Sequence, residues 1–418
     1  MKVLVLGSGA KEHAVAWWFS RSHFIEGLYV APGNIGTETI AKNLAIDPAD
    51  FDQVYKACKE YGIQYVFIGT EKPLFTGMVD KLNEKGIETF GASTSALKLE
   101  GDRNFSRNFT DRHNIPTPTH MMFDNESELS AYLRRHEGTR FVMKSNSVAP
   151  SRIMVDSSDY DSLIGFARTM LSSGAILLEE HLSGLSVTIT AMLDNNGYLL
   201  MPFCSDYMKT ESKGIPTGGM GSVCPVPLEA ATKSDIEERI IKPTLYGMKV
   251  ERLSYKGVLT FSVIITKNGP ILVDYHVRFN DPAAQAFIPL VKSDLIDILH
   301  AMKTDSISSY NLQVSQKSSV ALVIASAGYP QEPQTGKILE PMPAAVLRNS
   351  FADAPLFFFG GVERKDGQAV TTSGRCVTVV GSKENIIQSN KQAYLGAKYI
   401  KFPGAWFRDD IGDRFFEN

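Results

Sequence analysis

The chain has 418 residues, a formal net charge of −3, 43% hydrophobic residues and 21% charged residues, as in a globular protein of two to four domains. So small a net charge does not favour a nucleic-acid backbone or an anionic membrane surface as a partner. The four cysteines are far apart and form no Cys-x-x-Cys pair, which argues against a thiolate zinc site and a disulfide framework.

The first hundred residues alternate expected strands and helices. Strands are predicted at 3–6, 28–31 and 65–68, and a helix at about 11–21. Each strand ends in a loop that contains glycine, as in an open parallel sheet that binds ligands at the carboxyl ends of its strands. The first apolar run leads directly into glycine, unlike a signal peptide, and no apolar stretch is long enough to span a bilayer. We therefore expect a cytoplasmic protein.

A second unit begins near residue 99, and the last hundred residues are mostly β. In the middle of the chain, helices are expected at about 161–172 and 233–246. Further strands are predicted at 141–144, 176–179, 187–193, 258–265, 270–275, 320–326, 356–359 and 375–380. The pattern predicts an α/β and α+β multidomain chain, with an N-terminal open parallel sheet domain and a C-terminal mostly β domain. The expected domain ranges are 1–104, 105–190, 191–316 and 317–418.

Three glycine-containing loops follow the predicted N-terminal strands. The first, Gly7-Ser8-Gly9, is half of a dinucleotide fingerprint, but Glu12 stands where the third glycine is needed, so an NAD-dependent enzyme is a weak candidate. The loops at 31–37 and 69–74 can each be an ordinary turn. Because all three can offer backbone N–H groups to an anion, together they favour a phosphate-bearing ligand at this edge of the sheet.

Two later segments carry the other polar signals. Residues 217–221 have three glycines in four positions, which destabilises a helix or a strand and predicts a turn or a close ligand approach. After the strand at 270–275, alternation places Asp274, His276 and Arg278 on one face. An acid, an imidazole and a guanidinium on one face indicate a polar cavity, with a solvated edge strand as the alternative.

In their order along the chain, these segments resemble the phosphoribosylamine–glycine ligase family. The family pattern GxGGREHA is similar to 7–14, PGNxGT to 32–37, GPExPL to 69–74 and PNTGGMG to 215–221. Its FGP–LEGSKxF stretch resembles 90–105, its AGGYP resembles 326–330 and its RxDIG resembles 408–412. The likeness therefore covers essentially the whole chain and implies an ATP-grasp fold.

The resemblance also implies a reaction and a substrate side. ATP would phosphorylate the carboxylate of glycine, and the amine of 5-phosphoribosylamine would attack the glycyl phosphate to give glycinamide ribonucleotide, ADP and phosphate. Arg278, Lys144 and Asp281 would be catalytic, with Arg278 on the glycine carboxylate. The residues implied to bind the substrates are Gly9, Asn34, Glu71, Asp206, Thr217, Gly218, Gly219 and Met220.

On the ATP side the resemblance is weaker. The implied nucleotide-binding residues are Arg103, Lys144, Arg152, Glu179, Glu180 and Leu182, and the implied ligands of Mg²⁺ or Mn²⁺ are Asp274 and His276. The family's loop KADGLAAGKGV corresponds to 144–154 of this chain, which has no glycine across 145–153 and contains Pro150. Leu185 and Ala283 stand where the family has carboxylates, and His276 replaces an amide oxygen with nitrogen. These changes predict a weakened metal site.

Three functions agree with this pattern. The chain can be a working, divergent glycine ligase, which is the function we predict. It can instead be a ligase-fold protein that binds a phosphoribosyl ligand or a partner without ATP turnover, or an ATP-grasp ligase with a changed substrate or nucleotide. In each case we expect a monomer or a small homo-oligomer, with no nucleic-acid or membrane partner.

Overall fold

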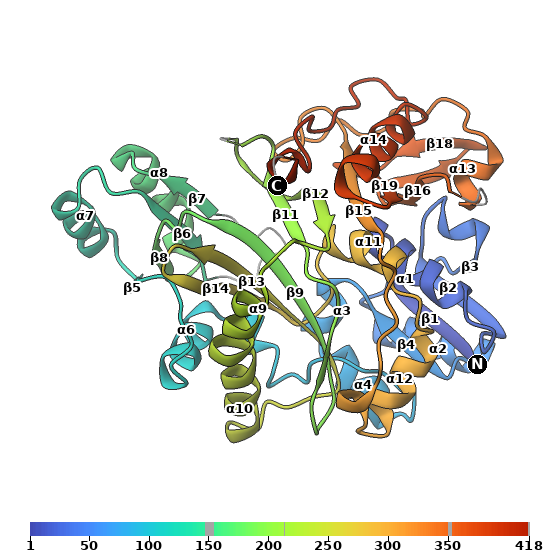
Figure 1. Ribbon diagram of the computed structural model, residues 1–418, viewed down its shortest axis with the longest axis horizontal. Coiled ribbons are helices and arrows are strands. Elements are labelled where there is room, and N and C mark those ends of the chain that lie inside the picture. Colours follow the sequence, from blue (N-terminus) through green and yellow to red (C-terminus); the bar gives the residue numbers. More distant parts are fainter. Residues whose placement is uncertain (147–153, 213, 350–352, 417–418) are drawn as a thin grey trace.

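The computed structural model describes residues 1–146, 154–212, 214–349 and 353–416 and has a small lobe beside a larger body (Figure 1). The small lobe is formed by the described residues between 120 and 180, and it lies on the left of the view. The body contains both termini, and the N-terminal and C-terminal thirds of the chain lie next to each other in it. No helix in the described ranges is long and apolar enough to cross a membrane.

The N-terminal part of the body is built on a four-stranded parallel sheet in the order β3-β2-β1-β4. Its strands are β1 (Lys2–Gly7), β2 (Gly27–Pro32), β3 (Lys42–Asn43) and β4 (Tyr65–Ile68). The helices around it are α1 (Ala10–Ser20), α2 (Phe51–Tyr61), α3 (Glu71–Phe75) and α4 (Met78–Glu84). All four apolar residues of β4 are buried, as expected for a parallel sheet covered on both faces. The predicted open parallel sheet is confirmed.

The small lobe has its own antiparallel sheet, in the order β5-β8-β6-β7, and its own core. The strands are β5 (His120–Phe123), β6 (Phe141–Ser145), β7 (Met154–Ser157) and β8 (Ile176–Glu180). Helices α7 (Glu126–Arg135) and α8 (Tyr160–Met170) pack against it and begin at the capping side chains of Asn125 and Asp159. The lobe is joined to the body through α5 (Lys98–Gly101) and α6 (Arg103–Arg112).

The centre of the molecule is an antiparallel sheet in the order β10-β9-β13-β14. Its strands are β9 (Leu185–Leu193), β10 (Tyr198–Leu200), β13 (Gly257–Thr266) and β14 (Gly269–His276). The predicted helix at 233–246 is longer than expected: α9 (Ala230–Ile236), a π-helical turn (Glu237–Ile241) and α10 (Lys242–Val250) follow one another without a break. On β14 and the residue after it, Tyr275 and Val277 are buried and the predicted polar face is only half-buried.

The fourth sheet combines strands from the middle and the end of the chain, in the order β11-β12-β15-β19-β16. Its strands are β11 (Ser205–Lys209), β12 (Pro216–Cys224), β15 (Ser318–Ala325), β16 (Leu356–Phe359) and β19 (Arg375–Lys383), with the hairpin β17 (Val362–Lys365) and β18 (Gln368–Thr371) beside it. Helices here are α11 (Ala283–Phe287), α12 (Leu295–Lys303), α13 (Ala344–Arg348) and α14 (Ile386–Ala397). The glycine-rich segment 217–221, expected as a turn or a close ligand approach, lies in strand β12.

Two buried side chains of the N-terminal part bind the start of the C-terminal hairpin. Nδ1 of His13 accepts a hydrogen bond from the backbone N–H of Phe359 at 2.9 Å, and Nδ2 of Asn34 donates to the carbonyl oxygen of Phe359 at 2.6 Å. Burial lowers the pKa of His13 to about 3, so its imidazole is neutral and can accept at Nδ1. These bonds fix the glycine loops of the N-terminal sheet against the C-terminal sheet.

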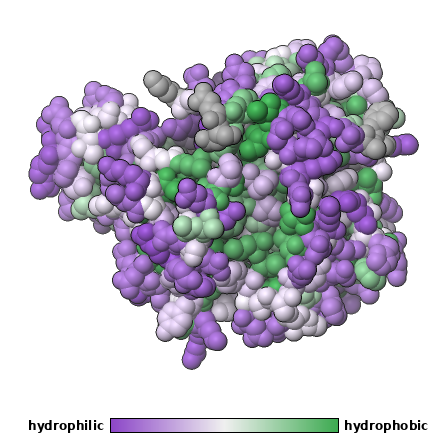
Figure 2. All heavy atoms as spheres, viewed as in Figure 1, coloured by the Kyte–Doolittle hydropathy of each residue, from purple (hydrophilic) through white to green (hydrophobic). Residues whose placement is uncertain are grey.

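The surface in the same view separates two kinds of side chain (Figure 2). Hydrophilic residues cover the small lobe and the outer rim of the body, while hydrophobic residues gather in the middle, between the two parts. The residues described below lie in two places: where the N-terminal and C-terminal parts of the body meet, and where the small lobe meets the body.

Candidate active site

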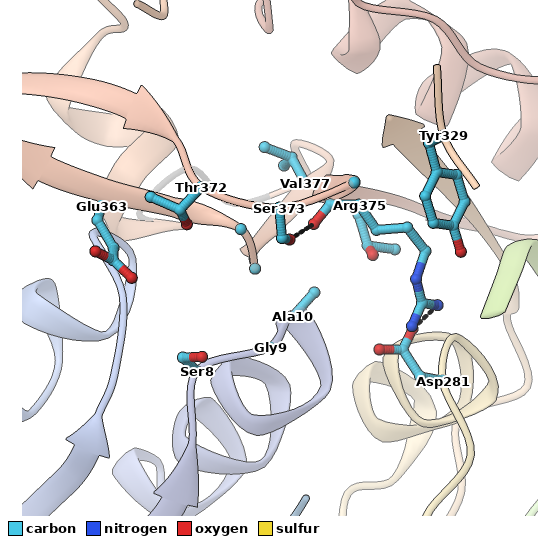
Figure 3. Close-up of a pocket in the computed structure, with 14 residues that line it drawn as sticks. Ser8, Gly9, Ala10, Asp281, Tyr329, Glu363, Thr372, Ser373, Arg375 and Val377 are labelled. Atoms are coloured by element: carbon cyan, nitrogen blue, oxygen red, sulfur yellow. Dashed lines mark hydrogen bonds and ion pairs between the residues drawn. The ribbon is translucent and has the colours of Figure 1, made fainter. Parts of the chain in front are cut away.

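A cavity of about 500 Å³ lies where the N-terminus of α1 meets the C-terminal sheet. In Figure 3, Ser8 and Gly9 form its floor, Glu363 and Thr372 lie on one side, and Arg375 faces Asp281 on the other. The predicted residues Gly9 and Asp281 both line it. The cavity thus joins three segments that are far apart in the sequence.

The glycine segment of β12 passes beside this cavity. The N–H of Gly218 donates to the hydroxyl of Tyr329 at 2.9 Å, and its carbonyl oxygen accepts from Nη1 of Arg375 at 2.6 Å. Gly219 has a φ of +108°, and a Cβ there would lie 2.5 Å from Cδ of Pro282, so only glycine fits. The expected close approach is made by the chain's own Asp281–Pro282 backbone.

The flanking positions of this segment differ in exposure. Oγ1 of Thr217 accepts from the N–H of Gly219 at 3.0 Å and holds the turn of the strand. Met220 is fully buried against Val323 and Ala325. Met220 therefore supports the segment from behind.

Arg278 follows β14 and has a buried donor without a partner. Its Nη2 pairs with Glu71 and lies 3.4 Å from Oε1 of Glu100, whereas its Nε is buried and has no hydrogen-bond partner among the described residues. Burial lowers the pKa of Arg278 to about 10, against the opposing effect of Glu12 and Asp281, so the side chain stays cationic at neutral pH. A ligand carboxylate would satisfy the free Nε.

The glycines of the first and third N-terminal loops surround the side chain of Glu12. A Cβ on Gly7, Gly9 or Gly69 would lie 2.4–2.5 Å from an atom of Glu12. Oε2 of Glu12 accepts from the N–H of Gly9 at 2.9 Å, and its Oε1 lies 3.2 Å from Nζ of Lys11. The residue that breaks the dinucleotide fingerprint is thus the one around which these loops pack.

Asn34 and Glu71, two predicted substrate-side residues, take different positions. The Asn34 amide is 2% exposed; its Oδ1 accepts from the N–H groups of Gly36 and Thr37, and its Nδ2 donates to Ser8 and Phe359. It therefore shapes the loops at the cavity. Glu71 is one-third exposed and pairs with Arg278.

Asp206 on β11 is a buried carboxyl group near this region. Its Oδ2 accepts from Oγ1 of Thr188 at 2.7 Å, and its Oδ1 has no hydrogen-bond partner in the described part of the chain. Burial raises the pKa of Asp206 to about 6, although Thr188 opposes the shift. Asp206 is therefore close to half-protonated in mildly acidic solution.

The predicted nucleotide side is a buried network of ion pairs between the small lobe and β14. Nζ of Lys144 lies 2.8 Å from Oε2 of Glu179 and 3.0 Å from Oδ2 of Asp274. Nε of Arg107 donates to Oε1 of Glu179 at 2.7 Å, and Nη1 of Arg103 donates to the carbonyl oxygen of Ser145 at 3.1 Å. The side chains of Lys144 and Glu179 are 1% and 2% exposed.

These cations keep both acids ionised. Burial by itself would raise the pKa of Asp274, but Lys144, Arg103 and Arg107 outweigh it and hold that pKa far below its ordinary value. The pKa of Glu179 is lowered in the same way, because Lys144 and Arg107 outweigh burial. Of the other predicted nucleotide residues, Glu180 is exposed at the end of β8, Leu182 is half-buried, and Arg152 lies outside the described residues.

The two predicted metal ligands differ in their fit to a divalent cation. Asp274 offers an anionic oxygen, the kind of donor that Mg²⁺ prefers. His276 has both ring nitrogens engaged, Nδ1 at 3.2 Å from Oε1 of Glu100 and Nε2 at 3.2 Å from Oγ of Ser262. Over the described ranges, no three His, Cys, Asp or Glu residues form a metal-binding group. Asp274 fits the cation, whereas His276 in its present pairing does not.

The sequence assigned no role to four residues of this site, Arg375, Tyr329, Glu100 and Glu12, although the last three lie in segments that resemble the family. Arg375 and Tyr329 follow Gly374 and Gly328, which belong to glycine-containing turns at the ends of predicted strands. The same signal identified the N-terminal loops and could have identified these two residues. Glu100 is buried on a four-residue helix and stands at the glutamate of the family's LEGSKxF stretch, which by itself gave it no role.

Family models and relatives match the whole length of this fold. Residues 1–100, 101–284 and 319–414 match the N domain, the ATP-grasp (A) domain and the C domain of phosphoribosylglycinamide synthetase. The chain is 32% identical to the phosphoribosylamine–glycine ligase of Rhodopirellula baltica, over 99% of this chain and 97% of that protein. It is also 32% identical to the human trifunctional purine biosynthetic protein adenosine-3, of which it covers 42%.

Solved structures agree on the fold. The crystal structure of a phosphoribosylamine–glycine ligase from Thermotoga maritima superposes with a TM-score of 0.82 at 24% identity and covers 98% of this chain and all of that one. A biotin carboxylase from Campylobacter jejuni, solved as a β-γ-ATP complex, superposes with a TM-score of 0.72 at 12% identity, over all of this chain and 95% of that one. From the full-length sequence matches, the chain belongs to the phosphoribosylglycinamide synthetase family.

Proposed function

We propose that this chain uses ATP to join glycine to 5-phosphoribosylamine, giving glycinamide ribonucleotide, ADP and phosphate by way of a glycyl phosphate. The observation that carries the proposal is the cationic Arg278, whose buried Nε has no partner in the described residues and which lies within electrostatic reach of Asp281 at the cavity. A planar guanidinium matches the planar carboxylate of an amino acid. The names of the full-length relatives support the same pair of substrates.

The cavity beside Arg278 suits the sugar phosphate. Ser8 and Gly9 bring the N-terminus of the eleven-residue helix α1 to its floor, where backbone N–H groups and the helix dipole favour an anion. Hydroxyl groups of Ser373, Thr372 and Tyr329 and the carboxylate of Glu363 line the rest and can bond to ribose hydroxyls. The roles of these individual residues are part of the proposal.

ATP would bind between the small lobe and β14, in the part of the chain that matches the ATP-grasp domain. Lys144 would supply positive charge to the phosphates, and Asp274 would hold Mg²⁺ or Mn²⁺. A bound divalent cation neutralises charge that develops on the transferred phosphoryl group. Which metal is used, and whether its site is weakened, are parts of the proposal that need the experiment.

The test uses the full chain with glycine, MgATP and 5-phosphoribosylamine generated in place, and follows ADP. We expect ADP formation to require all three substrates. If no ADP forms with Mg²⁺ or Mn²⁺ and calorimetry detects no nucleotide binding, the proposal is wrong. ADP that appears only with another amine or acid would instead identify a ligase with a changed substrate.

Nothing in the comparisons supports the alternative of a ligase-fold protein without ATP turnover. The cytoplasmic location and the monomeric or small homo-oligomeric state stay predictions. Size-exclusion chromatography with light scattering would measure the oligomeric state directly.

A further inference from the structure

Arg375 connects three segments that meet at the cavity. It is the first residue of β19, and its Nη1 lies 2.6 Å from the carbonyl oxygen of Gly218, 3.3 Å from that of Gly219 and 2.9 Å from Oδ1 of Asp281. The side chain is 27% exposed and forms the wall between the cavity and β12 (Figure 3). One guanidinium group thus sets the direction of two backbone carbonyls and one carboxylate.

The glycines around Arg375 leave room for this arrangement. A Cβ on Gly218 would lie 3.0 Å from Cζ of Arg375, and a Cβ on Gly374 would lie 2.2 Å from the ring of Tyr329. Tyr329 accepts the N–H of the same Gly218 whose carbonyl oxygen Arg375 binds. Gly218 is therefore held at its N–H by Tyr329, in the loop after β15, and at its carbonyl oxygen by Arg375 of β19.

Asp281 depends on the same contact. Its Oδ1 accepts from Arg375 and also from Nε2 of Gln285 at 2.9 Å. Asp281 also lies within electrostatic reach of Arg278. Without Arg375, the Asp281 carboxylate keeps only the neutral Gln285 as a hydrogen-bond donor and is free to turn toward Arg278, where it would compete with a ligand carboxylate.

We propose that Arg375 is a positioning residue that orients the Gly218–Gly219 backbone and Asp281, so that the cavity and the Arg278 side chain act on their ligands together. This inference rests on the proposed function for its substrates. It assigns to the C-terminal sheet a role in binding glycine and the sugar phosphate, and none in binding ATP, because in the described part of the chain Arg375 bonds to Gly218, Gly219 and Asp281. Its effect passes through Gly218, Gly219 and Asp281.

The experiment measures steady-state kinetics of Arg375→Ala and Arg375→Lys with each of the three substrates varied in turn. In Arg375→Ala we expect kcat/KM for glycine and for 5-phosphoribosylamine to fall by about tenfold to a hundredfold, the usual loss for a charged hydrogen-bond donor, while KM for ATP stays within about twofold. Guanidinium ion added to Arg375→Ala should restore part of the activity. Lysine, which has the charge without the planar fork, should restore less than arginine.

The matched control is Lys383→Ala, at the other end of the same strand. Lys383 pairs with Asp353 at 3.1 Å, outside the cavity and the nucleotide network, so all three KM values should stay unchanged. Thermal unfolding of every variant separates folding from positioning. If folded Arg375→Ala has normal kinetics for glycine and 5-phosphoribosylamine, or if KM for ATP rises equally with theirs, the inference is wrong.

A binding measurement separates this inference from the proposed function. Calorimetry with ribose 5-phosphate, the sugar phosphate without its amine, is run on the unaltered chain and on Arg375→Ala. If the unaltered chain makes no ADP but binds ribose 5-phosphate more tightly than the variant does, the function fails and the positioning role stands. If the unaltered chain is active and both proteins bind equally, the positioning role fails alone. Absence of both turnover and binding overturns both.

Discussion

The predicted nucleotide side and the predicted substrate side differ in how their main buried polar groups are paired: Lys144 has two ion-pair partners, whereas Arg278 and Asp206 each have a buried atom without a hydrogen-bond partner in the described chain. On the nucleotide side, Lys144 pairs with both Glu179 and Asp274, and its side chain is 1% exposed. On the substrate side, Nε of Arg278 and Oδ1 of Asp206 are buried without hydrogen-bond partners in the described chain. An unpartnered buried donor or acceptor costs about 1–3 kcal/mol, which a ligand can recover on binding.

This difference in pairing predicts which internal contacts each ligand would have to replace when it binds. A sugar phosphate would meet an open cavity, and the carboxylate of an amino acid would meet the free Nε of Arg278 beside the Arg278–Glu71 ion pair. A triphosphate that binds Lys144 must first compete with Glu179 and Asp274, whose pKa values are both held low. The internal ion pairs of Lys144 are what a nucleotide and its cation would have to replace, and the weakness of the ATP side stays a prediction.

The strongest way to break this comparison is to remove Lys144. Lys144→Met leaves Glu179 with Arg107 alone and Asp274 without its closest cation, and removing one partner of a buried pair costs about 3–5 kcal/mol of folding free energy. Chemical denaturation should show this loss, and calorimetry should show that nucleotide binding is abolished. Normal stability of the variant would mean that the network contributes nothing to folding.

A matched control for Lys144→Met is Lys209 on β11 of the body, which pairs with Asp156 of the small lobe. Lys209→Met removes one cation from Asp156, but Arg140 and His181 still bind that carboxylate, and Lys209 is 30% exposed. Its loss should cost no more than about 1 kcal/mol. Equal losses for both lysines would remove the distinction between buried and half-buried pairs.

The second variant tests the substrate side. Arg278→Ala should lower kcat/KM for glycine by roughly 30- to 1,000-fold, equivalent to about 2–4 kcal/mol, because a buried charged group that contacts a carboxylate is lost. The rate of ADP formation at varied glycine concentration gives kcat/KM for glycine in the variant and in the unaltered chain. Arg278→Lys keeps the charge beside Glu71 and separates this effect from unfolding.

The control for Arg278→Ala is Arg364→Ala, whose half-exposed side chain pairs with Glu38 at 3.2 Å away from Arg278. Its kinetics should equal those of the unaltered chain. If Arg278→Ala keeps its glycine dependence, Arg278 has no role in holding the carboxylate.

The third prediction uses the raised pKa of Asp206. A folded-state pKa of about 6, against the ordinary value of 3.8 for an aspartate, means that the folded chain holds this proton more tightly than the unfolded chain. The contribution of Asp206 to stability is therefore present below about pH 4 and lost as the pH rises to 6, by up to about 3 kcal/mol. The asparagine of Asp206→Asn does not titrate in this range. Its free energy of unfolding relative to that of the unaltered chain should therefore increase from pH 4 to pH 6 in denaturation curves. A difference that is constant with pH would contradict the assignment.

Much of the fold could be predicted because its signals are local. The strands at 65–68 and 356–359 have the predicted bounds, since short apolar runs between polar or glycine-containing segments are readable from the sequence. The glycines of 217–221 predict a turn or a close ligand approach, and the structure shows strand β12. Its neighbours β11 and β15 supply the pairing, and β15 is far away in the chain, so local propensity could not reveal it.

The site was predictable only where alternation or a glycine loop marked it. Arg278 was found because its face of the strand is polar, whereas Arg375 was missed because its partners Gly218 and Asp281 are 157 and 94 residues away. The role of Glu12 in filling the glycine loops could not be seen either, since a sequence shows the glycines and not what they pack against. The roles of the predicted site residues stay predictions until the variants are measured.

The smallest expected effect is at His276 and sharpens the nucleotide side of the comparison. Its ring nitrogens are engaged by Glu100 and Ser262, so they cannot serve a cation without leaving those partners. His276→Asn supplies an amide oxygen, a donor better suited to Mg²⁺, and can keep a hydrogen bond to Glu100 through its NH₂ group. Nucleotide affinity measured by calorimetry at varied Mg²⁺ should rise by no more than about tenfold, equivalent to 1.4 kcal/mol.

The control for His276→Asn is His181→Asn, which makes the same replacement beside Asp156, away from the Lys144 network. It should leave the Mg²⁺ dependence unchanged. If His276→Asn also has no effect, the metal site is not limited by this residue, and the competition of Lys144 for Asp274 becomes the remaining explanation for the predicted weak metal binding. In that case a higher Mg²⁺ concentration should tighten nucleotide binding equally in His276→Asn and in the unaltered chain. In both proteins the cation then has to displace the same Lys144–Asp274 ion pair.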